Sequence, residues 1–121
     1  MSSKHGSHWL EREDVGDVTV VRVRAPALGD DDTTREMFEQ IYTLVQQVGR
    51  RHLVLNLSAP EALRSLALGK LVMLNRRAQA AHGRLALCNL SPVAAEALEA
   101  TRLTPLFDVY GSEQEAVQSF A

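Results

Sequence analysis

Ser65 is the residue of this 121-residue chain that combines a reactive hydroxyl group with a position where a phosphate could be accommodated. It follows an apolar run and a loop, and it precedes a long amphipathic segment. If Ser65 opens a helix, its hydroxyl can cap that helix by accepting the amide of Ala67 or Leu68. A phosphate also suits the start of a helix, because free amides and the helix dipole attract negative charge there. A phosphoryl group on Ser65 would add a charge of about −1.5 to −2, which could switch off a binding face.

The other reactive side chains have simpler interpretations. Cys88 lies within an apolar run and is predicted to be a small core residue rather than a nucleophile. The three aspartates at residues 30–32 could hold a cation. The stronger interpretation is a solvated loop whose negative charges interact favourably with the positive end of the dipole of the helix that follows. His5 and His8 lack a third metal ligand. Asn56 ends an apolar run where a phospho-accepting receiver domain would need an aspartate.

Motifs for enzymatic chemistry are absent. The chain has no G-x-G-x-x-G, no phosphate-binding G-x-x-x-x-G-K-[ST] loop and no G-x-S-x-G elbow. Its four histidines and one cysteine do not cluster at metal-ligand spacing. We therefore predict no catalytic residue, no cofactor and no metal, and the chain is not expected to be an enzyme.

Composition narrows the class further. Thirteen basic and fifteen acidic residues give a net charge of −2, and aromatic residues make up 5% of the chain. This balance argues against a nucleic-acid partner. No apolar run approaches the roughly 20 residues of a membrane helix. With one cysteine and no signal-peptide pattern, the chain is expected to be cytoplasmic and to have no membrane partner.

Periodicity predicts strands alternating with helices. Strands are expected at residues 9–15, 18–23, 52–57, 84–89 and 106–110, with a tight turn at Gly16 and Asp17. Helices are expected at residues 33–48, 66–82, from Pro92 after a Ser91 cap, and after Ser112. A capping box of Thr33 and Glu36 would open the first helix, and Gly83 would end the second. The order indicates an α/β domain with parallel strand pairs.

The segments 54–58, 63–69, 76–85, 89–92, 103–110 and 112–116 together resemble the STAS domain family of bacterial anti-sigma factor antagonists. The likeness extends from about Trp9 to Phe120. The small, polar residues 1–8 are expected to form a flexible terminus, and with no linker or internal repeat the rest is expected to be a single STAS-like domain over residues 9–121. The likeness also implies a mixed sheet of about five strands flanked by about four helices.

The resemblance implies a function as well. In the family, a partner anti-sigma factor that is itself a serine kinase phosphorylates the first serine of the strand-to-helix loop, and Ser65 matches that serine. Leu68 and Gly69 match the residues that follow it. Arg64 replaces an acidic residue, Leu66 a second hydroxyl residue, and Ala67 a glycine. The predicted partner-binding residues are Arg64, Ser65, Leu66, Leu68 and Gly69.

Two alternatives remain open at this point. The changed loop could make a non-phosphorylated adaptor or scaffold subunit in a signalling complex. A small-ligand-binding α/β domain is the third hypothesis, because α/β sheets often bind ligands at the carboxyl ends of their strands.

Overall fold

A two-stranded hairpin opens the fold in the computed structural model, which describes residues 9–121. β1 (Leu10–Val15) and β2 (Val18–Val23) run antiparallel, and Val15 pairs with Val18 across the turn. Gly16 has a φ of 61°, in the left-handed region that glycine adopts readily. The predicted turn is therefore confirmed. The predicted flexible segment 1–8, with His5 and His8, lies outside the described residues.

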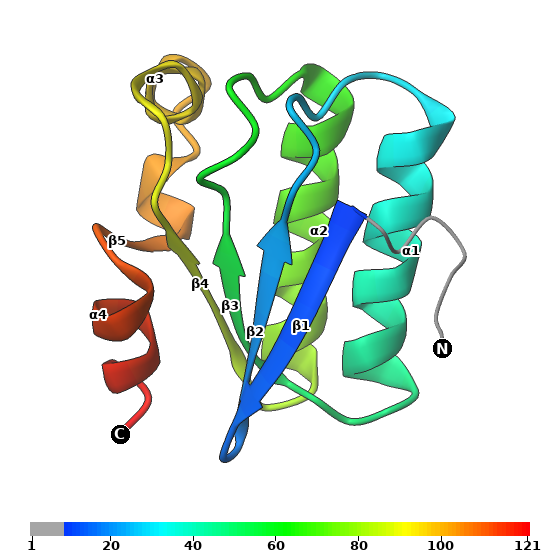
Figure 1. Cartoon of the computed structure of the whole chain (residues 1–121), viewed down its shortest axis with the longest axis vertical. Coiled ribbons are helices and arrows are strands. Elements are labelled where there is room, and N and C mark those ends of the chain that lie inside the picture. The colour runs from blue at the N-terminus through cyan, green and yellow to red at the C-terminus, as the bar shows by residue number, and fades with distance from the viewer. Residues whose placement is uncertain (1–8) are drawn as a thin grey trace.

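Helices and strands alternate along the rest of the chain. In order they are α1 (Asp32–Gln46), β3 (His52–Asn56), α2 (Ser65–Ala80), β4 (Arg84–Cys88), α3 (Pro92–Ala100), the short 3-10 helix η2 (Thr104–Leu106), β5 (Asp108–Tyr110) and α4 (Glu113–Gln118). The strands form one sheet in the spatial order β1-β2-β3-β4-β5 (Figure 1). β2 to β5 pair in parallel. The predicted α/β fold with a mixed sheet of five strands and four helices is confirmed.

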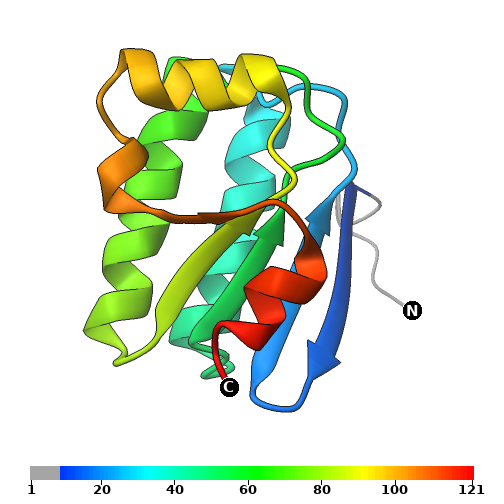
Figure 2. The same ribbon diagram turned by 90° about the vertical axis from the view of Figure 1, so that its left-hand side faces the viewer.

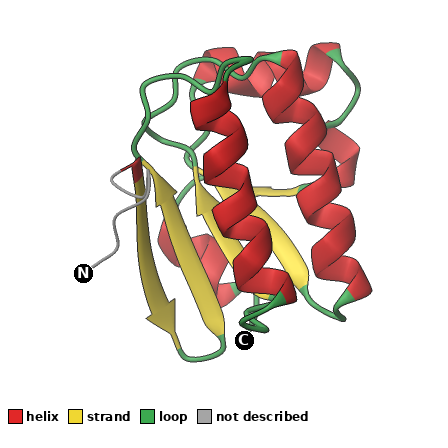
Figure 3. Ribbon diagram, turned by 90° about the vertical axis from the view of Figure 1, so that its right-hand side faces the viewer, coloured by secondary structure: helices red, strands yellow, loops and turns green. Residues whose placement is uncertain are grey.

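The two faces of the sheet are covered unequally. α1 and α2 cover one face, and α4 covers part of the other (Figures 2 and 3). Leu53 and Leu55 of β3 pack with α1 and α2, whereas Val54 between them packs on the α4 side. Because successive strand side chains point to opposite faces, the continuous apolar run of β3 is buried on both.

The predicted cap of α1 is wrong. Asp31, rather than Thr33, is the N-cap, and its carboxylate accepts the amide of Thr34 at 3.0 Å. An ionised carboxylate is a stronger acceptor than a hydroxyl at the positive end of a helix dipole. The bond to the Thr34 amide also lowers the pKa of Asp31.

The last strand begins later than the sequence predicts. Thr104–Leu106 forms η2, and β5 starts only at Asp108. The side-chain amide of Asn75, which lies 9% exposed on the inner side of α2, donates to the Leu106 carbonyl at 3.1 Å. This bond satisfies a buried polar group and anchors the turn to α2.

Gly83 does not end α2 as predicted, and glycine is required there for a different reason. α2 ends at Ala80, and His82 rather than Gly83 has the left-handed backbone, with a φ of 65°. A Cβ atom at Gly83 would lie 2.2 Å from the carbonyl oxygen of Arg51. Glycine is therefore needed here because the chain before β3 passes directly against the turn between α2 and β4.

Candidate functional site

Two loops are joined where α2 begins. Leu28 and Leu63 form an isolated parallel bridge. The Leu28 amide donates to the Ala62 carbonyl at 3.1 Å, and the Arg64 amide donates to the Leu28 carbonyl at 3.0 Å. The side chains of Leu28 and Leu63 are buried. The start of α2 is therefore fixed from outside the helix, at the end of the sheet where β2, β3 and β4 terminate (Figure 1).

The predicted role of Ser65 as a helix cap is wrong. Arg64 is the N-cap and makes no side-chain capping bond, while Ser65 is the first residue of α2. The amide of Leu66 donates instead to the carboxylate of Asp30 at 3.0 Å. A carboxylate from the loop after β2 thus occupies part of the positive end of the α2 dipole, and the Ser65 hydroxyl is not needed for that purpose.

Each of the three consecutive aspartates has a separate contact. Asp30 binds the start of α2, and Asp31 caps α1. The Asp32 carboxylate accepts from Arg35 one turn along α1, at 3.0 Å. The three do not converge on one point, and in residues 9–121 no group of three His, Cys, Asp or Glu side chains could hold a metal ion.

Four of the five predicted partner-binding residues are at least partly exposed to solvent. Arg64, Ser65 and Gly69 are exposed, and Leu66 is half-buried. A Cβ atom at Gly69 would meet nothing within 4 Å, so the helix surface is bare at this point. Leu68 is 8% exposed and packs in the main core. Leu68 therefore anchors the first turns of α2 to the core, and the exposed surface is formed by the other four residues.

The departures from the family pattern differ in their effect on this surface. Ala67 is fully buried, so its extra methyl group lies inside the core and leaves the exterior unchanged. Arg64 and Leu66 do reach the exterior. The chemical difference at the surface is therefore a cation and an aliphatic side chain on either side of Ser65.

A second polar cluster joins the sheet to α4. The Arg22 guanidinium donates to Glu113 at 2.6 Å and to Glu13 at 2.7 Å, and the Asn56 amide donates to Glu113 at 2.7 Å. The hydrogen bond from Arg22 is the main reason that the pKa of Glu113 lies below its usual value. Asn56 also accepts the Ser58 amide at 2.9 Å. The Asn56 side chain is thus a structural link between β3, its loop and α4.

Cys88 has the surroundings expected of a core residue. It is fully buried on the α4 side of the sheet, beside Val54 and Ala86. Burial raises the pKa of its thiol to about 12. At neutral pH the thiol is therefore protonated, which is the less nucleophilic form.

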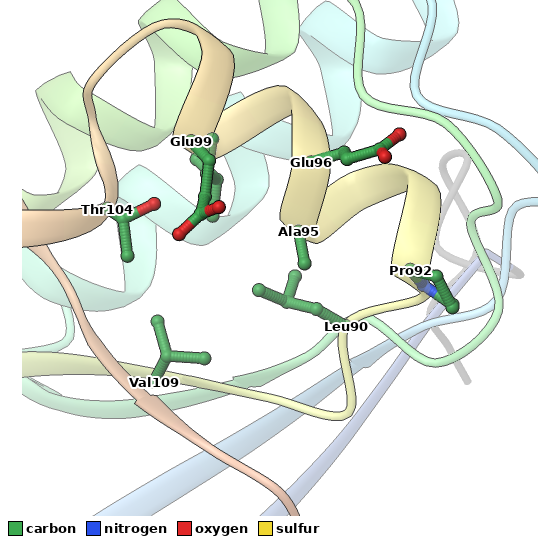
Figure 4. A pocket seen from close by; sticks show the side chains of 8 residues that line it. Leu90, Pro92, Ala95, Glu96, Glu99, Thr104 and Val109 are labelled. Carbon is green, nitrogen blue, oxygen red and sulfur yellow. The ribbon is translucent and has the colours of Figure 1, made fainter.

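A shallow hollow of about 210 Å³ lies between α3 and β5 (Figure 4). Its base is formed by Leu90, Ala95 and Val109, and two carboxylates, Glu96 and Glu99, stand on its α3 side. None of the five predicted partner-binding residues lines this hollow. Its polar lining consists of the two carboxylates and the Thr104 hydroxyl, and no motif in the sequence points to these groups, so the Ser65 region is the better candidate site.

No helix among residues 9–121 combines the length and the apolar character needed to cross a membrane.

The arrangement defines an α/β domain with an exposed serine at the start of its second helix. Among known proteins, the family model of the STAS domain matches residues 10–116. Because that match covers most of the sequence, this chain belongs to the STAS domain family. A search of curated proteins finds no match.

Solved structures share the fold. A STAS domain protein from Planctomyces limnophilus, an anti-sigma-factor antagonist, has a TM-score of 0.82 and 22% identity, over 91% of this chain and 96% of that one. An anti-sigma factor antagonist from Mycobacterium paratuberculosis gives 0.74 and 25%, over 91% of both chains. The Bacillus protein SpoIIAA in its phosphorylated form gives 0.70 and 21%, over 93% and 99%.

Proposed function

We propose that this protein is a non-enzymatic regulator that binds an anti-sigma factor through the start of α2. The binding surface would consist of Arg64, Ser65, Leu66 and Gly69, with Leu68 holding it from below. The observation that carries this proposal is the exposure of Ser65 as the first residue of α2, beside a bare helix surface at Gly69. Membership of the STAS family and the solved anti-sigma factor antagonists support it.

The same proposal includes a switch. The partner would be an anti-sigma factor with serine kinase activity that phosphorylates Ser65 and thereby ends its own binding. A phosphate would place about two negative charges between Arg64 and Leu66, and a docked partner would have to desolvate them. Arg64 could pair with this phosphate after transfer. SpoIIAA has been solved in a phosphorylated form, which supports a switch in this fold.

A second candidate function is an adaptor with no phosphorylation. The carboxylate of Asp30 favours it, because this group already occupies the Leu66 amide at 3.0 Å and would repel a phosphate on the neighbouring Ser65. In that case the α2 surface would bind its partner in one fixed state.

The two candidates separate in one experiment. The protein is incubated with ATP and an anti-sigma kinase from the same organism, and phosphate is located by mass spectrometry. The switch predicts phosphate on Ser65 and none in Ser65→Ala, while Ser58→Ala, at an exposed serine in the loop before α2, still accepts it. Binding of the partner to wild type without phosphate on Ser65 would establish the adaptor instead.

Partner affinity tests the surface itself. Ser65→Asp should weaken binding at least tenfold relative to Ser65→Ala, because it adds a negative charge within the proposed contact. Equal affinities would refute this placement of the interface.

A protein with this function would act in the cytoplasm, where sigma factors control transcription.

A further inference from the structure

α2 carries charge of one sign. Five of the thirteen Lys and Arg residues fall between Ala62 and Ala95, a stretch with no Asp or Glu. Arg64 caps α2, and Lys70, Arg76 and Arg77 lie within it. The whole chain has a net charge of −2, so this helix is opposite in sign to the molecule that carries it.

Two of these cations have no acidic, hydrogen-bonding or aromatic partner for their side chains in the part of the chain that the structure describes, whereas Lys70 and Arg77 lie over the Tyr42 ring and Arg84 pairs with Asp108. Arg64 and Arg76 are exposed, and neither takes part in any of the ion pairs among residues 9–121. Arg77, by contrast, lies 4.3 Å from the centre of the Tyr42 ring and donates to Gln46 at 3.0 Å. The guanidinium groups of Arg64 and Arg76 are therefore free to meet carboxylates from another molecule.

The free cations flank an apolar strip. Ser65, Gly69, Met73 and Arg76 are spaced three and four residues apart, so they lie along one side of the helix. We call these four residues, together with Arg64, the α2 ridge. Met73, 41% exposed, is the apolar side chain of the ridge.

We propose that the α2 ridge docks on an acidic surface of its protein partner. Arg64 and Arg76 would each pair with a carboxylate, on either side of an apolar contact at Gly69 and Met73. This inference rests on the proposed function, since it states the chemistry of the surface that the partner presents. Nucleic acid fits the ridge less well, because the ridge has no aromatic side chain on which a base could stack and its centre is apolar.

Charge of this kind speeds association and makes it depend on salt. The test uses the full chain, the double variant Arg64→Glu/Arg76→Glu and the control Arg51→Glu/Arg102→Glu, which reverses two exposed cations outside α2. Association rates with the anti-sigma factor are measured by surface plasmon resonance at about 25 and about 300 mM NaCl. Circular dichroism confirms that all three proteins are folded.

The wild-type rate should fall about tenfold or more between these two salt concentrations. The α2 variant should associate about tenfold more slowly at low salt and lose most of its salt dependence, and the control should match wild type. An α2 variant with the wild-type rate and salt response would overturn the proposal.

A protein that binds no anti-sigma factor would refute the proposed function, and the ridge is then judged by a second measurement. The ¹⁵N-labelled full chain is titrated with a peptide of alternating Glu and Leu, with its Lys counterpart and with a short DNA duplex. Amide shifts at Gly69, Met73 and Arg76 with the Glu peptide alone would support the inference. Shifts elsewhere, no shifts, a stronger response to DNA, or self-association that the α2 variant abolishes would overturn it.

Discussion

Replacing Gly69 with alanine should change stability and partner binding in opposite directions. Gly69 lies in the interior of α2, its φ is not positive, and an added Cβ atom would meet nothing within 4 Å. Alanine restricts the unfolded chain more than glycine does and favours the helix by about 0.5–1 kcal/mol. For a domain of this size, that gain corresponds to a rise in Tm of about 2–5 °C.

Gly83→Ala provides the matched comparison, because the same methyl group meets protein atoms there. The added Cβ would lie 2.2 Å from the Arg51 carbonyl oxygen and 2.6 Å from its carbonyl carbon. That oxygen also accepts the Arg84 amide at 3.1 Å. Overpacking costs about 1–3 kcal/mol and a weakened hydrogen bond about 1 kcal/mol, so a loss of about 2–4 kcal/mol is expected.

Urea denaturation followed by circular dichroism measures both variants, and surface plasmon resonance measures partner binding by Gly69→Ala. The methyl group stands at the centre of the proposed contact, so affinity should fall although the protein is more stable. A destabilised Gly69→Ala would refute the reasoning about the helix surface. A stabilised variant that binds as well as wild type would show that the partner does not contact Gly69.

Three further outcomes are expected. Asp30→Ala removes the acceptor for the Leu66 amide and should lower stability by about 1 kcal/mol, whereas Asp30→Asn keeps most of it; equal urea midpoints for Asp30→Ala and wild type would contradict this. The pKa of Glu113 is lowered in the folded protein, so its contribution to folding stability is complete above its ordinary pKa near 4.5 and is lost as pH falls through the lower folded-state pKa. Glu113→Gln should therefore reduce the fall of Tm with decreasing pH in thermal melts. An unchanged fall of Tm would show that Glu113 does not cause it. Cys88 should react with Ellman's reagent only as the protein opens, and rapid stoichiometric labelling in native buffer would show that it is accessible.

The sequence was sufficient for the order of the elements. Patterns of two and of three to four residues are local, and burial of each strand depends mainly on its own side chains. The run from His52 to Leu57 could therefore be identified as a strand buried on both faces. Ser91 and Ser112 were correctly predicted as caps, and both accept the amide three residues later at 3.1 Å.

The start of α2 could not be predicted in the same way, because its partner is distant in the chain. The group that binds the Leu66 amide is Asp30, which lies 36 residues away, and Glu113 reaches Asn56 across 57 residues. Serine before a helical pattern indicates a cap only when no stronger acceptor arrives from another loop. A run of three acidic residues was visible, and the contacts of Asp31 and Asp32 are local to α1, but the contact of Asp30 needs the loop before α2 to lie beside it, as the bridge between Leu28 and Leu63 shows.

The identical order of the strands in the chain and in the sheet has a consequence for how the domain forms. Each new strand pairs with the one made just before it, so no strand must be inserted between two that are already joined. Each sheet contact therefore closes only the segment between consecutive strands, which limits the loss of chain entropy before pairing. The sheet can grow in the direction of synthesis, from the hairpin to β5, with each completed edge serving as the template for the next strand.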